Sequence, residues 1–161
     1  MPGETRAAPR ARPSPDPEFA LADLTLEAAR TLLDAALAEG RARSLKPLAI
    51  AVHDARGALK AFAAEDGTSL KRGEIAQAKA LGALALGVSS RAIGTMAAER
   101  PHFVQAVSHV VGGMLAPVPG GVLLRRNGAL VGAVGISGDT SDNDEAAALA
   151  GAKAAGLDAD A

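Results

Sequence analysis

The sequence predicts an α+β fold, in which an antiparallel sheet of about five strands is flanked by helices. The clearest local signal is the dipeptide Asn127-Gly128 between two apolar runs, at residues 122–124 and 129–136. Because Asn and Gly tolerate the positive φ angles of a two-residue loop, this pattern is typical of a tight β-hairpin. The candidate elements follow the order α-β-β-α-α-α-β-β-β-α, so paired strands are separated by a group of helices. Segregation of this kind favours an α+β fold.

The first part of the chain predicts one helix and one hairpin. Thr25 is a good N-cap residue, and apolar residues recur after it at helical spacing as far as the region of Gly40. Residues 48–53 and 58–64 are short apolar runs that predict two strands. The turn between them, residues 54–57, begins with Asp and ends with Gly, which is the preference of a type I turn.

A group of helices is predicted in the middle of the chain. Residues 73–86 are rich in Ala and Leu, which predicts a largely buried helix. Either Ser89 or Ser90 is expected to cap a shorter helix that runs to Glu99.

Pro101 is expected to stop that shorter helix, and residues 102–111 predict a further helical segment. Residues 114–118 predict a strand that leads into the Asn-Gly hairpin. In the second strand of that hairpin, Gly132 and Gly135 would weaken the strand unless another backbone or a ligand must come close. We therefore expect this strand to be central, with another element packed tightly against it.

The hairpin is followed by a polar turn and an alanine-rich helix, at residues 145–156. Gly138–Glu145 contains four carboxylates, which would repel a phosphate but suit the positive end of a helix. The principal interpretation is helix capping, with Ser141 or Asp142 as the N-cap. A calcium or magnesium site and the polar edge of a ligand pocket remain as alternatives.

Composition limits the domain organisation and the classes of partner. The 161 residues are enough for one domain, predicted at residues 24–161, behind a disordered Pro- and Arg-rich tail at residues 1–23. The net charge of −1 and the three aromatic residues argue against nucleic acid and an anionic membrane as partners. The absence of cysteine excludes disulfides and thiolate ligands. Without an apolar run of membrane-spanning length, a cytoplasmic protein is expected.

Several long segments resemble the GlcG/HbpS family, which includes the C-terminal domain of PduO-type proteins. The matching segments are the opening helix LTLEAARTLLDAALAEG, the hairpin AVHDARGALKAFAAEDG, the helix IAQAKALGALALG, the segment ERPHF, and PVPGGVLLRRNGALVGAVGISGDTSDNDE. The resemblance covers roughly residues 24–157. Two departures are Arg56, where the family often has Gly, and alanines where a cysteine often follows Asp144-Glu145. The resemblance implies a profilin-like α/β sandwich, a homo-oligomer, and binding of haem or a related tetrapyrrole in some members.

A haem site needs an axial donor, most often His, and the chain has His53, His102 and His109. His102 and His109 are seven residues apart, roughly 10.5 Å along one helix, which is too far for both to bind one ion. His102, beside Phe103 at a helix start, is the preferred axial ligand, with a capping or packing histidine as the alternative. His109 is a further candidate, with a half-buried helix residue as its alternative, and for His53 we expect a hydrogen bond to its turn.

Arg91, in the first turn of a helix, is the basic residue best placed to pair with a haem propionate. Its alternative interpretation is an ordinary solvated surface charge.

Three function classes follow from these residues. The first is a small-molecule binding protein that holds haem or a related tetrapyrrole. The second is a small isomerase, lyase or hydrolase that acts on an acidic metabolite, with His102 or His53 as general acid or base. The third is an accessory subunit that stabilises a partner. The residues alone leave open whether the protein is an enzyme.

Overall fold

The computed structural model describes residues 24–161, and the tail predicted at residues 1–23 lies outside the described part of the chain. The described residues form helices and strands in the order α-β-β-α-α-α-β-β-α-β. The elements are α1 (Leu26–Ala42), β1 (Ala49–Asp54), β2 (Leu59–Ala64), α2 (Arg72–Leu86), α3 (Ser90–Glu99), α4 (Pro101–Val110), β3 (Gly121–Arg126), β4 (Ala129–Ser137), α5 (Ser141–Ala154) and β5 (Asp158–Asp160).

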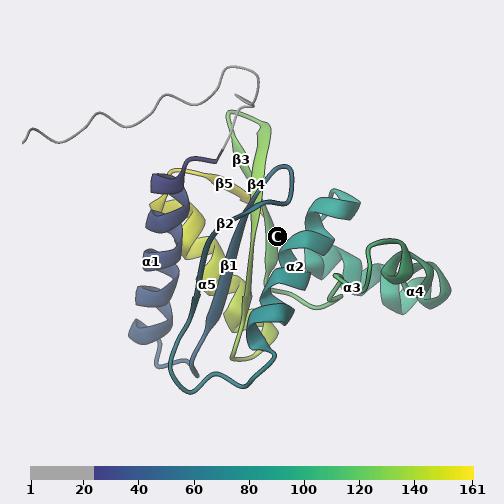
Figure 1. Ribbon diagram of the computed structural model, residues 1–161, viewed down its shortest axis with the longest axis horizontal. Coiled ribbons are helices and arrows are strands. Elements are labelled where there is room, and N and C mark those ends of the chain that lie inside the picture. The colour runs from purple at the N-terminus through teal and green to yellow at the C-terminus, as the bar shows by residue number, and fades with distance from the viewer. Residues whose placement is uncertain (1–23) are drawn as a thin grey trace, which may run out of the picture.

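The strands form one antiparallel sheet in the order β2-β1-β4-β3-β5 (Figure 1). β4 therefore lies at the centre, between β1 and β3. Its Gly135 is opposite Ala51 on one side and Gly121 on the other. The α+β fold, the antiparallel sheet and the central position of the glycine-containing strand are thus confirmed.

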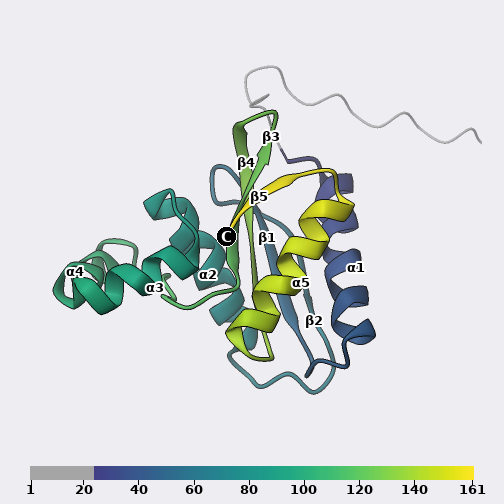
Figure 2. The ribbon, with the colours of Figure 1, turned by 180° about the vertical axis from the view of Figure 1, so that it is seen from behind.

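α1 and α5 cover one face of the sheet (Figure 2). This face contains the larger apolar side chains of alternating strand positions, such as Ile50 and Val52 of β1 and Val134 and Ile136 of β4. The helices meet them with leucines and alanines, and these residues together form the main core.

α2 covers the opposite face at much closer range. Ala49 and Ala51 of β1 on this side are small, and a Cβ atom on Gly135 would overlap with the carbonyl oxygen of Ala76 in α2. The backbone of the helix therefore touches the backbone of β4, which explains why the central strand carries a glycine at this position.

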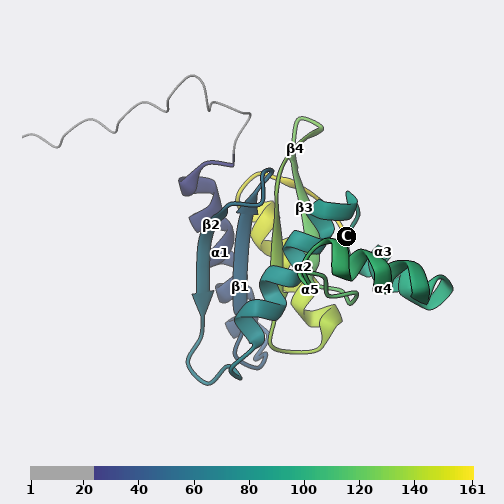
Figure 3. The same cartoon turned by 45° about the vertical axis from the view of Figure 1, so that its right-hand side comes forward.

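α3 and α4 form an arm that projects from the α2 side of the molecule (Figure 3). The arm is attached through α3, where the Ser90 hydroxyl accepts a hydrogen bond from the Gly121 N–H at 2.7 Å. Among the described elements, α4 packs against α3 alone. Within residues 24–161 no single helix has the length and hydropathy of a membrane span, and α2 with α3 reaches them only as a pair bent by 76°.

Both predicted turns have the expected geometry. Asn127 and Gly128 have φ angles of 52° and 81°, so the β3–β4 loop uses the left-handed region at both positions. In the β1–β2 turn, the Gly57 N–H donates to the Asp54 carbonyl at 2.9 Å, and Gly57 has a φ of 85°. Thr25 caps α1 and Ser89 caps α3 through their side-chain oxygens, as predicted.

The strand predicted at residues 114–118 is wrong. This segment is an irregular loop in which the Val118 N–H donates to the Ala116 carbonyl at 2.9 Å, and Pro117 has no N–H to give to a neighbouring strand. The fifth strand is instead β5, which pairs with Leu123–Arg125 of β3. The predicted N-cap of α5 is also wrong, because the Thr140 side chain accepts from the Asn143 N–H and the helix begins at Ser141.

The close contact between α2 and β4 predicts that Gly135→Ala lowers the free energy of unfolding by about 3 kcal/mol, since the added methyl would strike a backbone oxygen. Gly73→Ala is the matched control. Its new methyl would meet only the half-exposed ring of Phe62, which can move, and alanine favours the helix. Urea denaturation of both variants measures the difference, and equal stabilities would contradict the close packing.

Candidate functional site

The predicted haem-site residues lie on the α3–α4 arm. His102 is in the first turn of α4 and His109 in its last, and both are exposed. Phe103 is 43% exposed, and the guanidinium of Arg100 lies 4.8 Å from the centroid of its ring. The structure therefore brings His102 and Phe103 together on an exposed helix. The two histidines are separated by two helical turns, so they face the same side without meeting.

Arg91 lies in the first turn of α3 and binds carboxylates of this chain. Its Nη2 lies 2.9 Å from Glu145 Oε1, its Nε lies 3.0 Å from the same oxygen, and Nη2 also pairs with Asp142. Hydrogen bonds to Glu145 and Asp142 raise the pKa of Arg91 above its ordinary value. Because Glu145 is buried, this contact anchors the arm to the start of α5.

A buried ion pair lies where α2 meets the start of α5. Lys79 Nζ is 3.0 Å from Asp144 Oδ2 and 2.8 Å from the carbonyl oxygen of Ile136, and the two side chains are 2% and 1% exposed. Burial lowers the pKa of Lys79 and raises the pKa of Asp144, and their mutual attraction opposes both shifts. The pair has no route to an external ligand, which makes it structural.

The other carboxylates at the start of α5 also have partners in the chain. Asp139 accepts hydrogen bonds from Asn143 Nδ2 at 2.6 Å, from the Lys46 N–H at 2.8 Å and from the Thr140 N–H at 2.8 Å. These donors, Asn143 first, lower the pKa of Asp139 to about 2. None of the acidic residues is the N-cap, but they stabilise the helix start and its surroundings. Among residues 24–161, no group of three or more His, Asp or Glu side chains is arranged to bind a metal ion.

His53 makes the predicted hydrogen bond to its turn. Its Nδ1 lies 3.0 Å from the Gly57 carbonyl, which only accepts, so Nδ1 carries the proton. Its Nε2 is buried and has no hydrogen-bond partner in the described part of the chain. At 2% exposure, this ring is closed to an external ligand.

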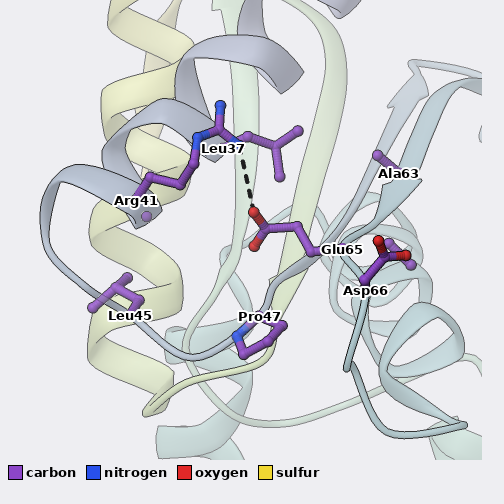
Figure 4. A pocket seen from close by; sticks show the side chains of 9 residues that line it. Leu37, Arg41, Leu45, Pro47, Ala63, Glu65 and Asp66 are labelled. Atoms are coloured by element: carbon purple, nitrogen blue, oxygen red, sulfur yellow. Dashed lines mark hydrogen bonds and ion pairs between the residues drawn. The ribbon is translucent and has the colours of Figure 1, made fainter.

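The cavity drawn in Figure 4 lies between α1 and the end of β2, away from the predicted haem residues. Its volume is about 540 Å³, within the range of small-molecule sites. The ion pair between Arg41 and Glu65, at 3.4 Å, lies across it, and Glu65 also accepts from the Leu48 N–H at 2.8 Å. The lining residues are Leu37, Gly40, Arg41, Leu45, Pro47, Ala63, Ala64, Glu65 and Asp66, none of which has an imidazole or thioether to bind iron.

A second cavity of about 480 Å³ lies between the same two elements. Its lining includes the cations Arg30 and Lys60 together with Asp34 and Phe62. Sequence reasoning missed both cavities because each is made by side chains from segments far apart in the chain. The buried pair was also missed, although a lysine within an alanine-rich helix is a recognisable signal, since buried lysines need a partner.

These features define the class: an α+β protein with a five-stranded antiparallel sheet, helices on both faces and an exposed helical arm. Residues 24–153 match the family described as haem degrading protein HbpS-like, and the chain belongs to this HbpS-like family. No curated protein matches the chain in sequence.

Solved structures share the fold. The PduOC–haem complex superposes with a TM-score of 0.77 at 22% identity, over 86% of this chain and 99% of that one. Protein ORFY of Klebsiella pneumoniae has a TM-score of 0.75 at 21% identity, over 83% and 90% of the two chains. HbpS has a TM-score of 0.72 at 24% identity, over 92% and 96%. The predicted family resemblance is thus confirmed.

The buried pair predicts that Lys79→Met lowers the free energy of unfolding by about 3–5 kcal/mol, because Asp144 would be left buried without its cation. The double variant Lys79→Met/Asp144→Asn should be less destabilised than the sum of the two single variants. Lys71→Met is the control, since the Lys71–Glu74 pair is exposed and its loss should cost under about 1 kcal/mol. Strictly additive effects in chemical denaturation would show that the two groups do not interact.

The hydrogen bonds to Asp139 predict acid-sensitive stability. Its pKa is about 2 in the folded state and 3.8 ordinarily, so the unfolded chain takes up a proton first as the pH falls. The stability that Asp139 contributes is complete above about pH 4 and is lost between there and pH 2. The difference in unfolding free energy between the wild type and Asp139→Asn, measured from pH 6 to pH 2, should therefore shrink over that interval. A difference independent of pH would refute the role of the charge.

Proposed function

We propose that the protein binds haem or a related tetrapyrrole. The observation that carries this proposal is the match of residues 24–153 to a family described as haem degrading. The likeness to a structure described as a haem complex, over 99% of that chain, supports it. None of the matches reported above names an acidic metabolite, so the alternative of a small metabolic enzyme has no observation in its favour.

His102 is the proposed axial ligand. Its imidazole is exposed at the start of α4, and the adjacent ring of Phe103 offers an apolar surface against which a planar ligand can lie. His109 lies two turns further along the same face, where it can contact the same ligand or a neighbouring one. Arg91 is the proposed partner of a propionate, which would compete with Glu145 and Asp142 for its guanidinium.

The cavity between α1 and β2 is the competing location. It supplies an apolar lining and the cation Arg41, which is 63% exposed and can pair with a carboxylate of the ligand. Because its lining has no axial donor, a tetrapyrrole bound there would lack a protein ligand to its iron from these residues. A tetrapyrrole bound at His102 should therefore show the absorption spectrum of an imidazole-ligated haem, and one bound in the cavity should not. We further propose that the protein is cytoplasmic and forms homo-oligomers.

Titration of the purified full chain with hemin should give a saturable Soret shift. His102→Ala should bind at least about tenfold more weakly and lose the spectral signature of an imidazole ligand. His109→Ala is the matched control on the same helix, and it should keep that signature.

Ala63→Leu, which enlarges a side chain on the α1 face of β2 that lines the cavity, should leave haem binding unchanged. A Soret shift that is lost in Ala63→Leu but kept in His102→Ala would place the ligand in the cavity and reject His102. No saturable shift in the wild type would reject tetrapyrrole binding itself.

A further inference from the structure

The outer face of α4 is apolar although nothing in the described structure covers it. Val104 forms the buried side of this ten-residue helix, and α3 is the only described element against which it packs. Phe103 is 43% exposed, Val110 is 84% exposed, and Ala106 between them is exposed as well. Because exposed apolar patches on a protein surface mark interaction sites, we expect a partner to cover these residues.

The residues of this outer face are spaced in a repeating pattern. His102 and His109 are seven residues apart, and so are Phe103 and Val110, which is nearly two full helical turns. Ala106 lies midway between both pairs. Viewed from outside, the two histidines occupy one edge of the face, the two apolar residues occupy the other edge, and a small residue lies at the centre.

This pattern is complementary to itself when a second copy runs in the opposite direction. The two-fold axis in this arrangement runs across the width of the face, perpendicular to both helices. It relates two antiparallel copies and keeps each edge of the face on its own side. His102 therefore lies beside His109 of the partner subunit, and Phe103 lies beside Val110 of the partner subunit. A parallel arrangement would instead place histidines against apolar side chains. The alanine at the centre allows the two helix axes to approach to about 8 Å.

The area of the face limits what apolar contact can do alone. A helix of ten residues is about 15 Å long, and one of its faces buries far less than the roughly 800 Å² per partner of a stable complex. Metal binding by the histidines at the edge of the face can supply the remaining free energy of association. Imidazole is a common ligand of zinc and related ions, and each end of the pair would bring two imidazoles together from different subunits.

We propose that two copies of this chain pair antiparallel through α4 and bind a Zn²⁺ ion at each end, between His102 of one copy and His109 of the partner subunit. Each copy alone holds only single ligands, because its own histidines are roughly 10.5 Å apart. Water completes the tetrahedral coordination of each ion. The pairing would cover His102 and Phe103, so the zinc-bound pair and a tetrapyrrole held by His102 exclude one another, and the pairing is tested without haem.

Sedimentation velocity of the full chain, with zinc chloride and then with excess EDTA, measures the pairing. Zinc should double the sedimenting mass and EDTA should reverse the change. His102→Ala and His109→Ala should each lose this response, whereas Gln105→Ala, an exposed polar position on the same helix, should keep it. Circular dichroism of each variant shows that the exposed substitutions leave the fold intact.

Mixing the two histidine variants provides the decisive measurement. A mixed pair contains one end with neither histidine and one end with both, so an equimolar mixture should regain zinc-dependent pairing that neither variant shows alone. Ala106→Glu, which blocks the centre of the face, should abolish pairing with both histidines present. A zinc response that survives either histidine substitution, or a mixture that stays unpaired, would overturn the proposal. Haem titration of the same variants is a separate readout, so failure of one function leaves the other standing.

Discussion

The buried ion pair between Lys79 and Asp144 is the contact on which the arrangement of the layers depends. Lys79 comes from α2 on one face of the sheet, and Asp144 comes from the first turn of α5, which packs on the other. Since neither charge is exposed to bulk water, each is tolerated only because the other is present. The ammonium group also binds the Ile136 carbonyl near the end of β4. One residue of α2 thereby fixes the central strand and the helix that follows it at a single point.

The parts of the fold that were predictable are those encoded by local chemistry. Asn127-Gly128 specifies its own turn, Thr25 and Ser89 each offer a capping oxygen, and Gly135 signals a close backbone approach. β5 was missed because a three-residue polar strand has no periodicity of its own and exists only by pairing with β3. The sequence also did not identify Thr140 as the N-cap of α5, because Ser141 and Asp142 next to it are equally good capping residues. The backbone conformation at the entry to the helix decides between them.

The candidate site was predictable only as a set of residue types. Helical spacing placed His102 and His109 on one helix at too great a distance to share one ion, and in the structure they lie in the first and last turns of α4. Arg91 was chosen for the reach of its guanidinium to a carboxylate, and in the structure it reaches Glu145 and Asp142 of its own chain. The cavity between α1 and β2 could not be predicted from the sequence, because no motif marks its lining residues. They come together only when β2 takes its place at the edge of the sheet beside α1.

The histidines and the cavity belong to parts of the molecule that are joined through the start of α5. Arg91 of the arm pairs with Glu145 of this segment, and Lys79 of α2 pairs with its Asp144. The Lys46 N–H, just before β1, donates to its Asp139. The four carboxylates thus hold three otherwise separate segments, which is why so many negative charges can gather at one helix end without a metal ion. The base of the arm does not depend on Arg91 alone, because Ser90 and Ile93 of α3 are fully buried and Ser90 is hydrogen-bonded to Gly121 of β3. The arm is therefore fixed at its base, while α4 at its far end packs only on α3 among the described elements and can present its outer face to a second copy.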